Sequence, residues 1–295
     1  MGLPTRDQVA ERLRGVSPTA EPLLVDGLLP AVRYATQPTT DAEIAVGSSK
    51  IGGDPDLAAG VEWPFWLGPD GGKTRRPLRF FAQLNLEHAW SAAPGELGLP
   101  STGLLSFFAD FTDDGITGIL GLYDDEQEGC RVLYSAPGAS LERRRSTLPV
   151  LQPAALYPLG AWTWLQDVEA DDYDAFEAWE TEYENRLREQ CPPGWDLGGR
   201  HQLGGHARYI QHPVEEEVVQ AVSGCFKRGR GGAFDHDRWL EVEDQVKDWR
   251  VLLQIDSDQT LDLIWGDVGT LWWAAPSADA ARGDWSRAMF NFQCA

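Results

Sequence analysis

Two segments far apart in the chain carry the same seven-residue pattern, and this internal repeat constrains the fold more than any other feature of the sequence. Residues 79–85 read RFFAQLN and residues 250–256 read RVLLQID, so each has Arg, three apolar residues, Gln, one apolar residue and then Asn or Asp. Two further blocks repeat in the same order: KIGGDP at 50–55 with QLGGHA at 202–207, and GLLSFFAD from Gly103 with GTLWWAAP from Gly269. This order predicts two copies of one β-rich unit.

The repeat, together with short apolar runs between turns, predicts one β-rich α+β domain built from two related halves. We expect a roll-like, pseudo-two-fold arrangement with a few covering helices. The predicted boundaries are an N-terminal helical extension at 1–27 and a single domain at 28–295, with half-repeats at about 45–160 and 198–295 and an acidic helix at about 168–189 between them.

Alternation along each repeated strand predicts which side chains share a face of the sheet. The residues expected to share a face are Arg79, Phe81, Gln83 and Asn85 in the first repeat and Arg250, Leu252, Gln254 and Asp256 in the second. A buried glutamine amide must find hydrogen-bond partners. Gln83 and Gln254 therefore either tie neighbouring loops to the sheet or face the seam between the halves and bind a polar ligand.

Composition excludes several classes of protein. The chain has 295 residues, of which 42% are hydrophobic, and 25 Lys and Arg against 46 Asp and Glu give a net charge of −21. The hydrophobic content argues against a disordered chain, and the acidity argues against binding a nucleic-acid backbone. We expect no membrane span and no secretory signal, because long apolar runs are absent. The four widely spaced cysteines are typical of free thiols in a reducing compartment, so we expect a cytoplasmic protein.

The clearest predicted helix is also the most acidic part of the chain. Between residues 166 and 189 there are ten Asp or Glu and two Arg, so this segment carries −8. Its acidic residues form either a solvated helix face or a docking face for a basic partner. The candidate docking residues are Asp171, Asp172, Asp174, Glu177, Glu180 and Glu184.

Several blocks, in order, resemble the YwqG-like family of bacterial proteins, and the resemblance covers the chain from about Leu28 onwards. They are Ser49–Pro55, Trp63-Pro64, Pro77–Asn85, Leu99-Pro100 with Gly103–Phe108, His201–His206 ending at Ile210-Gln211, Leu252–Asp256 and Trp265–Gly269. The resemblance implies a single β-rich α+β domain in a cytoplasmic protein without an agreed activity. Some relatives occur beside polymorphic toxin systems, which implies an immunity role. The acidic helix is a local elaboration on the family pattern.

A pocket at the seam between the two halves is the second place where we expect function. Trp63 and Trp265 would form its walls, and His206 follows a Gly-Gly pair that favours a turn. Asp267 stands at a tight turn, where it either caps backbone N–H groups or faces the pocket. The full set of candidate ligand-binding residues is Lys50, Trp63, Gln83, His206, Gln211, Gln254, Trp265 and Asp267.

Metal-binding and catalytic patterns are weak. Asp256, Asp258, Thr260, Asp262 and Asp267 have the spacing of calcium ligands, but Leu261 replaces the glycine of such a loop, so an acidic β-turn is favoured. The spacings of His201, His206 and His212 match no usual zinc pattern. We find no G-x-S-x-G elbow and no phosphate-binding glycine loop. We therefore expect no metal and no cofactor, and no catalytic residue can be named.

The sequence leads to two functional hypotheses. The first is a non-catalytic acidic binding protein that masks a basic protein partner, as an immunity protein masks a toxin, and that binds neither nucleic acid nor membrane. The alternative is an enzyme or small-ligand sensor with a polar pocket at the seam. A purely structural module is also compatible with the sequence.

Overall fold

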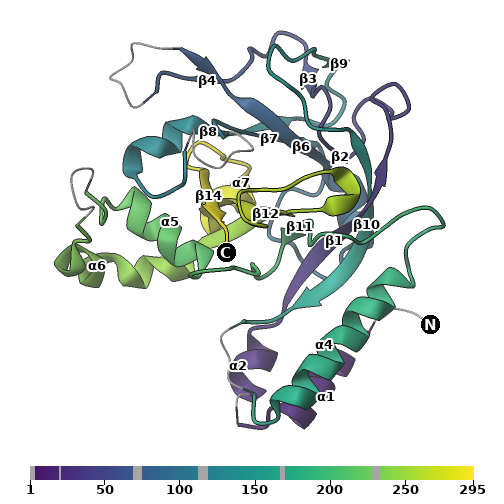
Figure 1. Cartoon of the computed structure of the whole chain (residues 1–295), viewed down its shortest axis with the longest axis vertical. Coiled ribbons are helices and arrows are strands. Elements are labelled where there is room, and N and C mark those ends of the chain that lie inside the picture. The colour runs from purple at the N-terminus through teal and green to yellow at the C-terminus, as the bar shows by residue number, and fades with distance from the viewer. Residues whose placement is uncertain (1–3, 20, 69–74, 112–118, 167–169, 228–232) are drawn as a thin grey trace.

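The computed structural model describes residues 4–19, 21–68, 75–111, 119–166, 170–227 and 233–295. Its main feature is a ten-stranded antiparallel sheet that curls until its edge strands β14 and β8 contact each other (Figure 1). The strands lie in the order β14 (Met289–Gln293), β13 (Thr270–Pro276), β12 (Trp249–Asp256), β11 (Gln202–Gly204), β1 (Leu29–Pro38), β10 (Ala154–Thr163), β2 (Lys50–Ile51), β6 (Arg79–Asn85), β7 (Leu104–Ala109) and β8 (Cys130–Ser135).

Two small ribbons and several short helices complete the connections. The ribbons pair β3 (Asp56–Ala58) with β9 (Leu141–Arg143), and β4 (Phe65–Trp66) with β5 (Arg76–Pro77). The short helices are α3 (Leu86–Ala92), α7 (Ser277–Arg282) and the 3₁₀ turns η1 (Asp124–Gly129), η2 (Glu243–Asp248) and η3 (Gln259–Leu261).

The concave side of the curled sheet holds an aromatic core. Phe81 lies between Trp265 and Trp273, with ring centroids 5.9 and 5.4 Å away. Phe111 joins this cluster to Phe290 of β14, at 5.4 Å. Edge-to-face and tilted contacts of this kind add to the hydrophobic gain from burying large rings. The core therefore connects strands from both ends of the sheet order.

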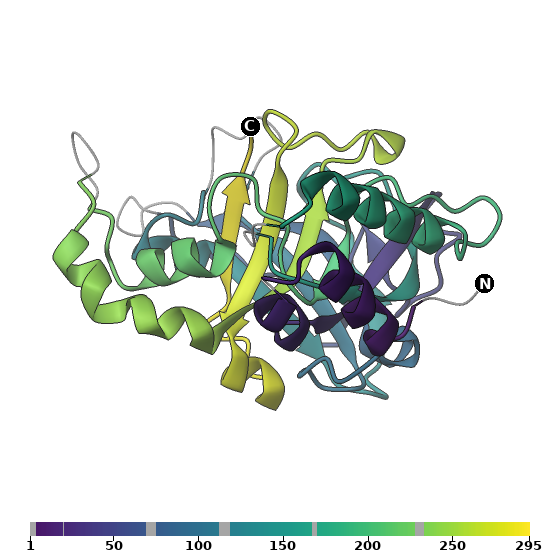
Figure 2. The ribbon, with the colours of Figure 1, turned by 90° about the horizontal axis from the view of Figure 1, so that it is seen from below.

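Two groups of helices cover the convex side (Figures 1 and 2). The first group, α1 (Arg6–Val16), α2 (Glu21–Asp26) and α4 (Tyr173–Arg188), packs on β1 and β10. The second group, α5 (Val214–Val222) and α6 (His236–Val242), lies beside β12 to β14 with η2. The expected β-rich α+β architecture with covering helices is confirmed. The predicted helix at 168–189 is observed as α4, and residues 168 and 169 lie outside the described part of the chain.

A β-bulge in β12 changes the face on which its first arginine lies. The pairing of β12 with β13 shifts between Val251 and Leu253. The residues of β13 that stand opposite Arg250 and Gln254 are three positions apart on a regular strand, so they point to opposite faces. Arg250 and Gln254 consequently point to opposite faces too. The prediction that they share a face was wrong, because alternation assumes an unbroken strand.

β6 carries a bulge at the matching place. Its pairing with β7 shifts between Phe80 and Ala82, and the residues opposite Arg79 and Gln83 are again three apart. The predicted sharing of a face by Arg79 and Gln83 was therefore also wrong. In both strands the arginine therefore points to the face of the sheet opposite the face of the glutamine.

Candidate functional site

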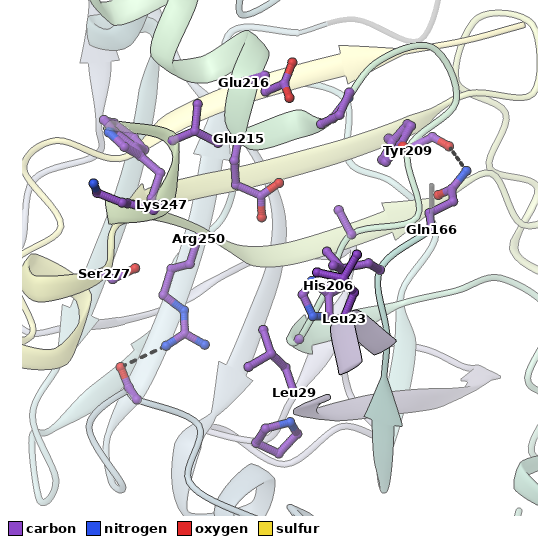
Figure 3. A pocket seen from close by; sticks show the side chains of 18 of the residues that line it. Leu23, Leu29, Gln166, His206, Tyr209, Glu215, Glu216, Lys247, Arg250 and Ser277 are labelled. Carbon is purple, nitrogen blue, oxygen red and sulfur yellow. Dashed lines mark hydrogen bonds between the residues drawn. The ribbon is translucent and has the colours of Figure 1, made fainter. Parts of the chain in front are cut away.

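A cavity of about 790 Å³ lies where β12, α5, α2 and the segment after β11 meet (Figure 3). Its volume falls within the range of about 300–1,000 Å³ that small-molecule sites occupy. Much of the lining is apolar, and it comes from segments that are far apart in the sequence. The apolar lining residues are Leu23, Leu29, Pro30, Leu165, Ala207, Tyr209, Pro213, Val246 and Trp249.

The Gly204–Gly205 pair directs the chain into this cavity. Both residues have positive φ, +66° and +70°, a conformation that glycine adopts without strain. A Cβ atom on Gly205 would lie 2.5 Å from the hydroxyl of Thr163 and 2.7 Å from Ala31. Glycine therefore lets the chain leave β11 close against β1 and β10, and it brings His206 to the cavity wall.

Arg250 is the most buried cation of the cavity. Its Nη1 donates a hydrogen bond of 3.3 Å to the carbonyl of Gly98, and its Nε is buried without a hydrogen-bond partner among the described residues. Burial lowers the pKa of the guanidinium, although the nearby Glu215 opposes that change. The bulge of β12 is what turns this side chain toward the cavity rather than toward the face of Gln254.

Glu215 extends from the first turn of α5 toward the same space (Figure 3). Burial raises the pKa of its carboxyl, and hydrogen bonds from backbone N–H groups, including that of Val251, only partly offset this effect. Glu215 and Arg250 attract each other electrostatically, yet no ion pair within 4.0 Å joins them in the described structure. The cavity thus holds a guanidinium and a poorly solvated carboxyl group that do not form an ion pair with each other.

His206 and Tyr209 provide the neutral polar groups. The His206 Nε2 donates to the carbonyl of Gly27 at 2.5 Å, and burial lowers the pKa of the ring. The neutral ring then keeps Nδ1 as a hydrogen-bond acceptor. The Tyr209 hydroxyl is buried and has no hydrogen-bond partner among the described residues, whereas its backbone carbonyl accepts from Gln166 at 3.1 Å.

Comparison with known proteins identifies the family of the chain. The model of DUF1963, a domain of unknown function, matches residues 49–294. The chain belongs to the DUF1963 family. A search of the curated proteins found no match. The DUF1963 domain supplies Arg250, Glu215, His206 and Tyr209, whereas residues before it, on α2 and at the start of β1, supply only apolar lining.

The structure spreads the eight predicted ligand-binding residues over the DUF1963 domain, and of these His206 alone is among the described residues that line the cavity. Lys50 and Gln83 lie together on β2 and β6, away from it. The Lys50 ammonium is fully buried and pairs with Asp41 at 2.7 Å. Gln83 donates to the Ser48 carbonyl at 2.8 Å and to the Asp56 carboxylate at 2.7 Å, so it ties the segment before β2 and the start of β3 to the sheet.

Gln254 makes an equivalent set of contacts in the other part of the DUF1963 domain. Its Oε1 accepts from the backbone of Arg208 at 3.0 Å and from the Trp272 indole at 3.1 Å, and its Nε2 donates to Asp256 at 2.7 Å. The amide therefore fixes the segment that follows His206. Gln254 supports a wall of the cavity from outside it.

The remaining four predicted residues also lie elsewhere. Trp265 is buried in the aromatic core, and the Trp63 indole donates to the Leu78 carbonyl at 2.9 Å. Gln211 donates to the carbonyl of Cys294 at 2.9 Å, and Asp267 is exposed on a turn. The sequence missed Arg250 and Glu215, although an arginine at the head of both repeat blocks was the available signal for Arg250.

The six acidic residues of the predicted docking face divide into three pairs. Asp171 accepts from the backbone of Thr19 at 2.8 Å, and Asp172 caps α4 by accepting from Ala175 at 3.0 Å. Asp174 and Glu177 are exposed.

Glu180 and Glu184 face the sheet instead of solvent. Glu180 contacts Arg208 at 2.5 Å, and Glu184 contacts both Arg33 at 2.8 Å and Arg200 at 2.6 Å. The face that remains exposed is smaller than the sequence indicates.

Two carboxylates of the acidic segment at the end of β12, those of Asp256 and Asp258, are used within the protein. Asp256 accepts from the Arg200 backbone at 3.0 Å and from the Thr270 hydroxyl at 3.1 Å. Asp258 pairs with His201 at 3.1 Å. In the described ranges, no three His, Cys, Asp or Glu side chains are placed to hold a metal ion together. Nor does that part of the chain contain a helix long and apolar enough to cross a membrane.

Proposed function

We propose that this DUF1963 protein binds a small organic molecule in the cavity beside Arg250. One observation carries the proposal: Arg250 and Glu215, two groups of complementary chemistry, both line the cavity, and no ion pair within 4.0 Å joins them in the described structure. Withdrawing ionisable groups from water without pairing them is costly, and a few such polar groups in a largely apolar cavity are typical of a binding site. A ligand that pairs with both groups would offset that cost.

The residues that line the cavity favour a binding site over a catalytic site. The His206 ring contacts the Gly27 carbonyl, and no hydroxyl or thiol of the described residues is hydrogen-bonded to it, so the pair that a nucleophile and its base would form is not seen here. The charged groups lie among leucines and a tryptophan, which is the usual composition of a recognition site. A sensor or carrier of a small molecule fits these features better than a hydrolase or transferase.

A thermal-shift screen against a library of cytoplasmic metabolites tests this proposal. Compounds at 100 times their Kd should stabilise the fold by about 2.7 kcal/mol. The variant Leu165→Trp should abolish the stabilisation, because Leu165 lines the cavity and its exposed side chain can be enlarged without repacking the core. The matched control is Ile264→Trp, since Ile264 is equally exposed (40% against 39%) but lies outside the cavity. A library without any stabilising compound, or compounds that stabilise Leu165→Trp as well as the wild type, would refute it.

A second proposal concerns the exposed acidic residues of α4. A cytoplasmic, immunity-like role in masking a basic protein is supported by the net charge of −21 and by the exposure of Asp174 and Glu177. Affinity capture from the native cytoplasm at low salt should then retain a basic protein, and Asp174→Lys with Glu177→Lys should release it. Capture that survives both substitutions would exclude this face.

We also propose that the domain consists of two related halves, in keeping with its resemblance to YwqG-like proteins. From the central pair β1 and β10, the order runs outward through β11, β12, β13 and β14 on one side and β2, β6, β7 and β8 on the other. Gln254 pairs with Gln202 just as Gln83 pairs with Lys50, and the bulges stand at matching positions. Superposition of the two four-strand sets should keep this register; a superposition that shifts it would contradict the relation.

A further inference from the structure

The chemistry of the cavity defines the class of its ligand more narrowly, if the proposed small-molecule function holds. We infer that the ligand is a small zwitterion with an apolar body, whose carboxylate is bound by Arg250 and whose ammonium group is bound by Glu215. An α-amino acid with a large apolar side chain has this chemistry.

The guanidinium of Arg250 and the carboxyl group of Glu215 call for two complementary charges on one ligand, because a ligand ammonium group beside Glu215 favours the ionised carboxyl. A simple anion would satisfy Arg250 but would oppose ionisation of the partly buried Glu215. A simple cation would satisfy Glu215 and leave the partly buried guanidinium of Arg250 without an ion pair. A molecule that carries both charges satisfies each group and adds no net charge to a cavity from which water is displaced.

The other charged side chains of the lining are less suited to this role. Glu96 and Lys247 are exposed, and Lys247 lies 3.8 Å from Asp244. Glu216 is engaged in an interaction of its own. Arg250 and Glu215 are therefore the two charged groups that a ligand in the cavity would reach away from bulk water.

The neutral ring of His206 also favours a zwitterionic ligand. The His206 Nδ1 is an acceptor, so it can take a second N–H of a ligand ammonium group. The ammonium end of a zwitterion thus meets one acidic group, Glu215, and one neutral acceptor, His206.

Three leucines indicate an apolar body on the ligand. Leu23, Leu29 and Leu165 are 63%, 40% and 39% exposed, and all three line this cavity although they come from different segments. Scattered exposed leucines are ordinary, but three around one cavity form an apolar patch of the kind that marks a binding site. Trp249 adds an aromatic side chain to the lining. A purely polar zwitterion would leave this surface in contact with water.

Isothermal titration with matched analogues tests the inference. The probes are leucine, phenylalanine and tryptophan, each with the amine that lacks its carboxylate and the acid that lacks its ammonium group. At least one of the three amino acids should bind, and at least tenfold more tightly than both of its truncated analogues. The variant Arg250→Gln should weaken binding of that amino acid and its acid at least tenfold but leave the amine unchanged.

The reciprocal variant Glu215→Gln should weaken binding of the amino acid and the amine but leave the acid unchanged. Lys247→Gln is the matched control, because Lys247 lines the cavity but is exposed, and it should change affinity less than twofold. Arg250→Lys keeps the charge and should retain more affinity than Arg250→Gln, which separates loss of charge from a folding defect.

The possible results distinguish failure of the zwitterion assignment from failure of the proposed small-molecule function. Truncated analogues that bind as tightly as the amino acid would overturn the zwitterion assignment. The assignment would also fall if none of the nine probes bound while compounds of the library still stabilised the protein through the cavity, in which case the proposed function would stand. If no compound of the library stabilised the wild type, both the zwitterion assignment and the proposed function would be wrong.

Discussion

Asp258 and His201 form a buried pair whose contribution depends on pH. Their side chains are each 1% exposed and meet at 3.1 Å, and the second carboxylate oxygen of Asp258 accepts from the backbone and the hydroxyl of Thr260 at 2.8 and 2.7 Å. Burial alone would raise the pKa of Asp258, but the hydrogen bonds from His201 and Thr260 outweigh it and lower the pKa to about 2. The folded protein therefore favours the ionised carboxyl.

The substitution Asp258→Asn should remove this pH-dependent stabilisation. Because the pKa is lower in the folded than in the unfolded chain, the contribution of Asp258 is complete above about pH 4 and disappears as the pH falls toward 2. We expect the variant to lose about 2 kcal/mol of unfolding free energy at pH 7 and to depend less on pH between 4 and 2. Urea unfolding across this range measures both effects.

The matched control for that experiment is Asp248→Asn, because Asp248 is exposed at the end of η2. This control should keep the slope of the wild-type stability curve. An Asp258→Asn protein with the same slope as the control would mean that the pair with His201 does not stabilise the folded state.

At the scale of helices and strands, the sequence predicted the elements that have a regular pattern but not the β-bulges that interrupt them. The spacing of apolar residues located α4, and the repeated blocks located β6 and β12. The bulges in those strands depend on pairing with a neighbour, which one strand's sequence does not reveal. Arg250 was consequently assigned to the wrong face and left out of the predicted site. The cavity escaped prediction for a related reason: its lining comes from segments that only the tertiary fold brings together.

Helix α4 shows how composition can mislead about a single element. Its acidity suggested a uniform docking face, but Glu184 lies between Arg33 and Arg200 of the sheet side. Burial alone would raise the pKa of Glu184, and the attraction of these two arginines outweighs it and lowers the pKa. The carboxylate is therefore a structural counterion rather than part of a solvated surface.

The substitution Glu184→Gln should accordingly destabilise the protein by about 2 kcal/mol, because it leaves two partly buried arginines without their shared counterion. Denaturant unfolding at pH 7 measures the loss. The matched variant Glu177→Gln changes an exposed residue of the same helix and should stay within about 0.5 kcal/mol of the wild type. Equal effects of the two variants would contradict the assignment of Glu184 to the interior.

At the scale of the whole molecule, the stability of the fold depends on the contacts that join the two edges of the curled sheet. Beyond the contact of β14 with β8, the segment before η1 packs on β14, where Phe292 donates to the Leu120 carbonyl at 3.2 Å. The Glu126 carboxylate accepts from three successive backbone N–H groups, those of Leu120, Gly121 and Leu122, at 3.2, 2.7 and 2.9 Å. This carboxylate fixes the segment that closes one end of the sheet on the other, and Gly121 lies at its centre.

Replacing Gly121 by Ala should therefore weaken the closure itself. Gly121 has a φ of +83°, and a Cβ there would collide with the Phe290 carbonyl and approach the Asn291 Cα to 2.8 Å, both in the backbone of β14. Gly60→Ala is the matched control, since Gly60 has a φ of +81° and open space around its Cβ position. The control should lose about 1–2 kcal/mol through backbone strain alone. Gly121→Ala should lose at least about 3 kcal/mol, because β14 must also move away from the core it covers. Chemical unfolding measures both losses. If the two variants lost the same unfolding free energy, the sheet would be held closed by its aromatic core rather than by this contact.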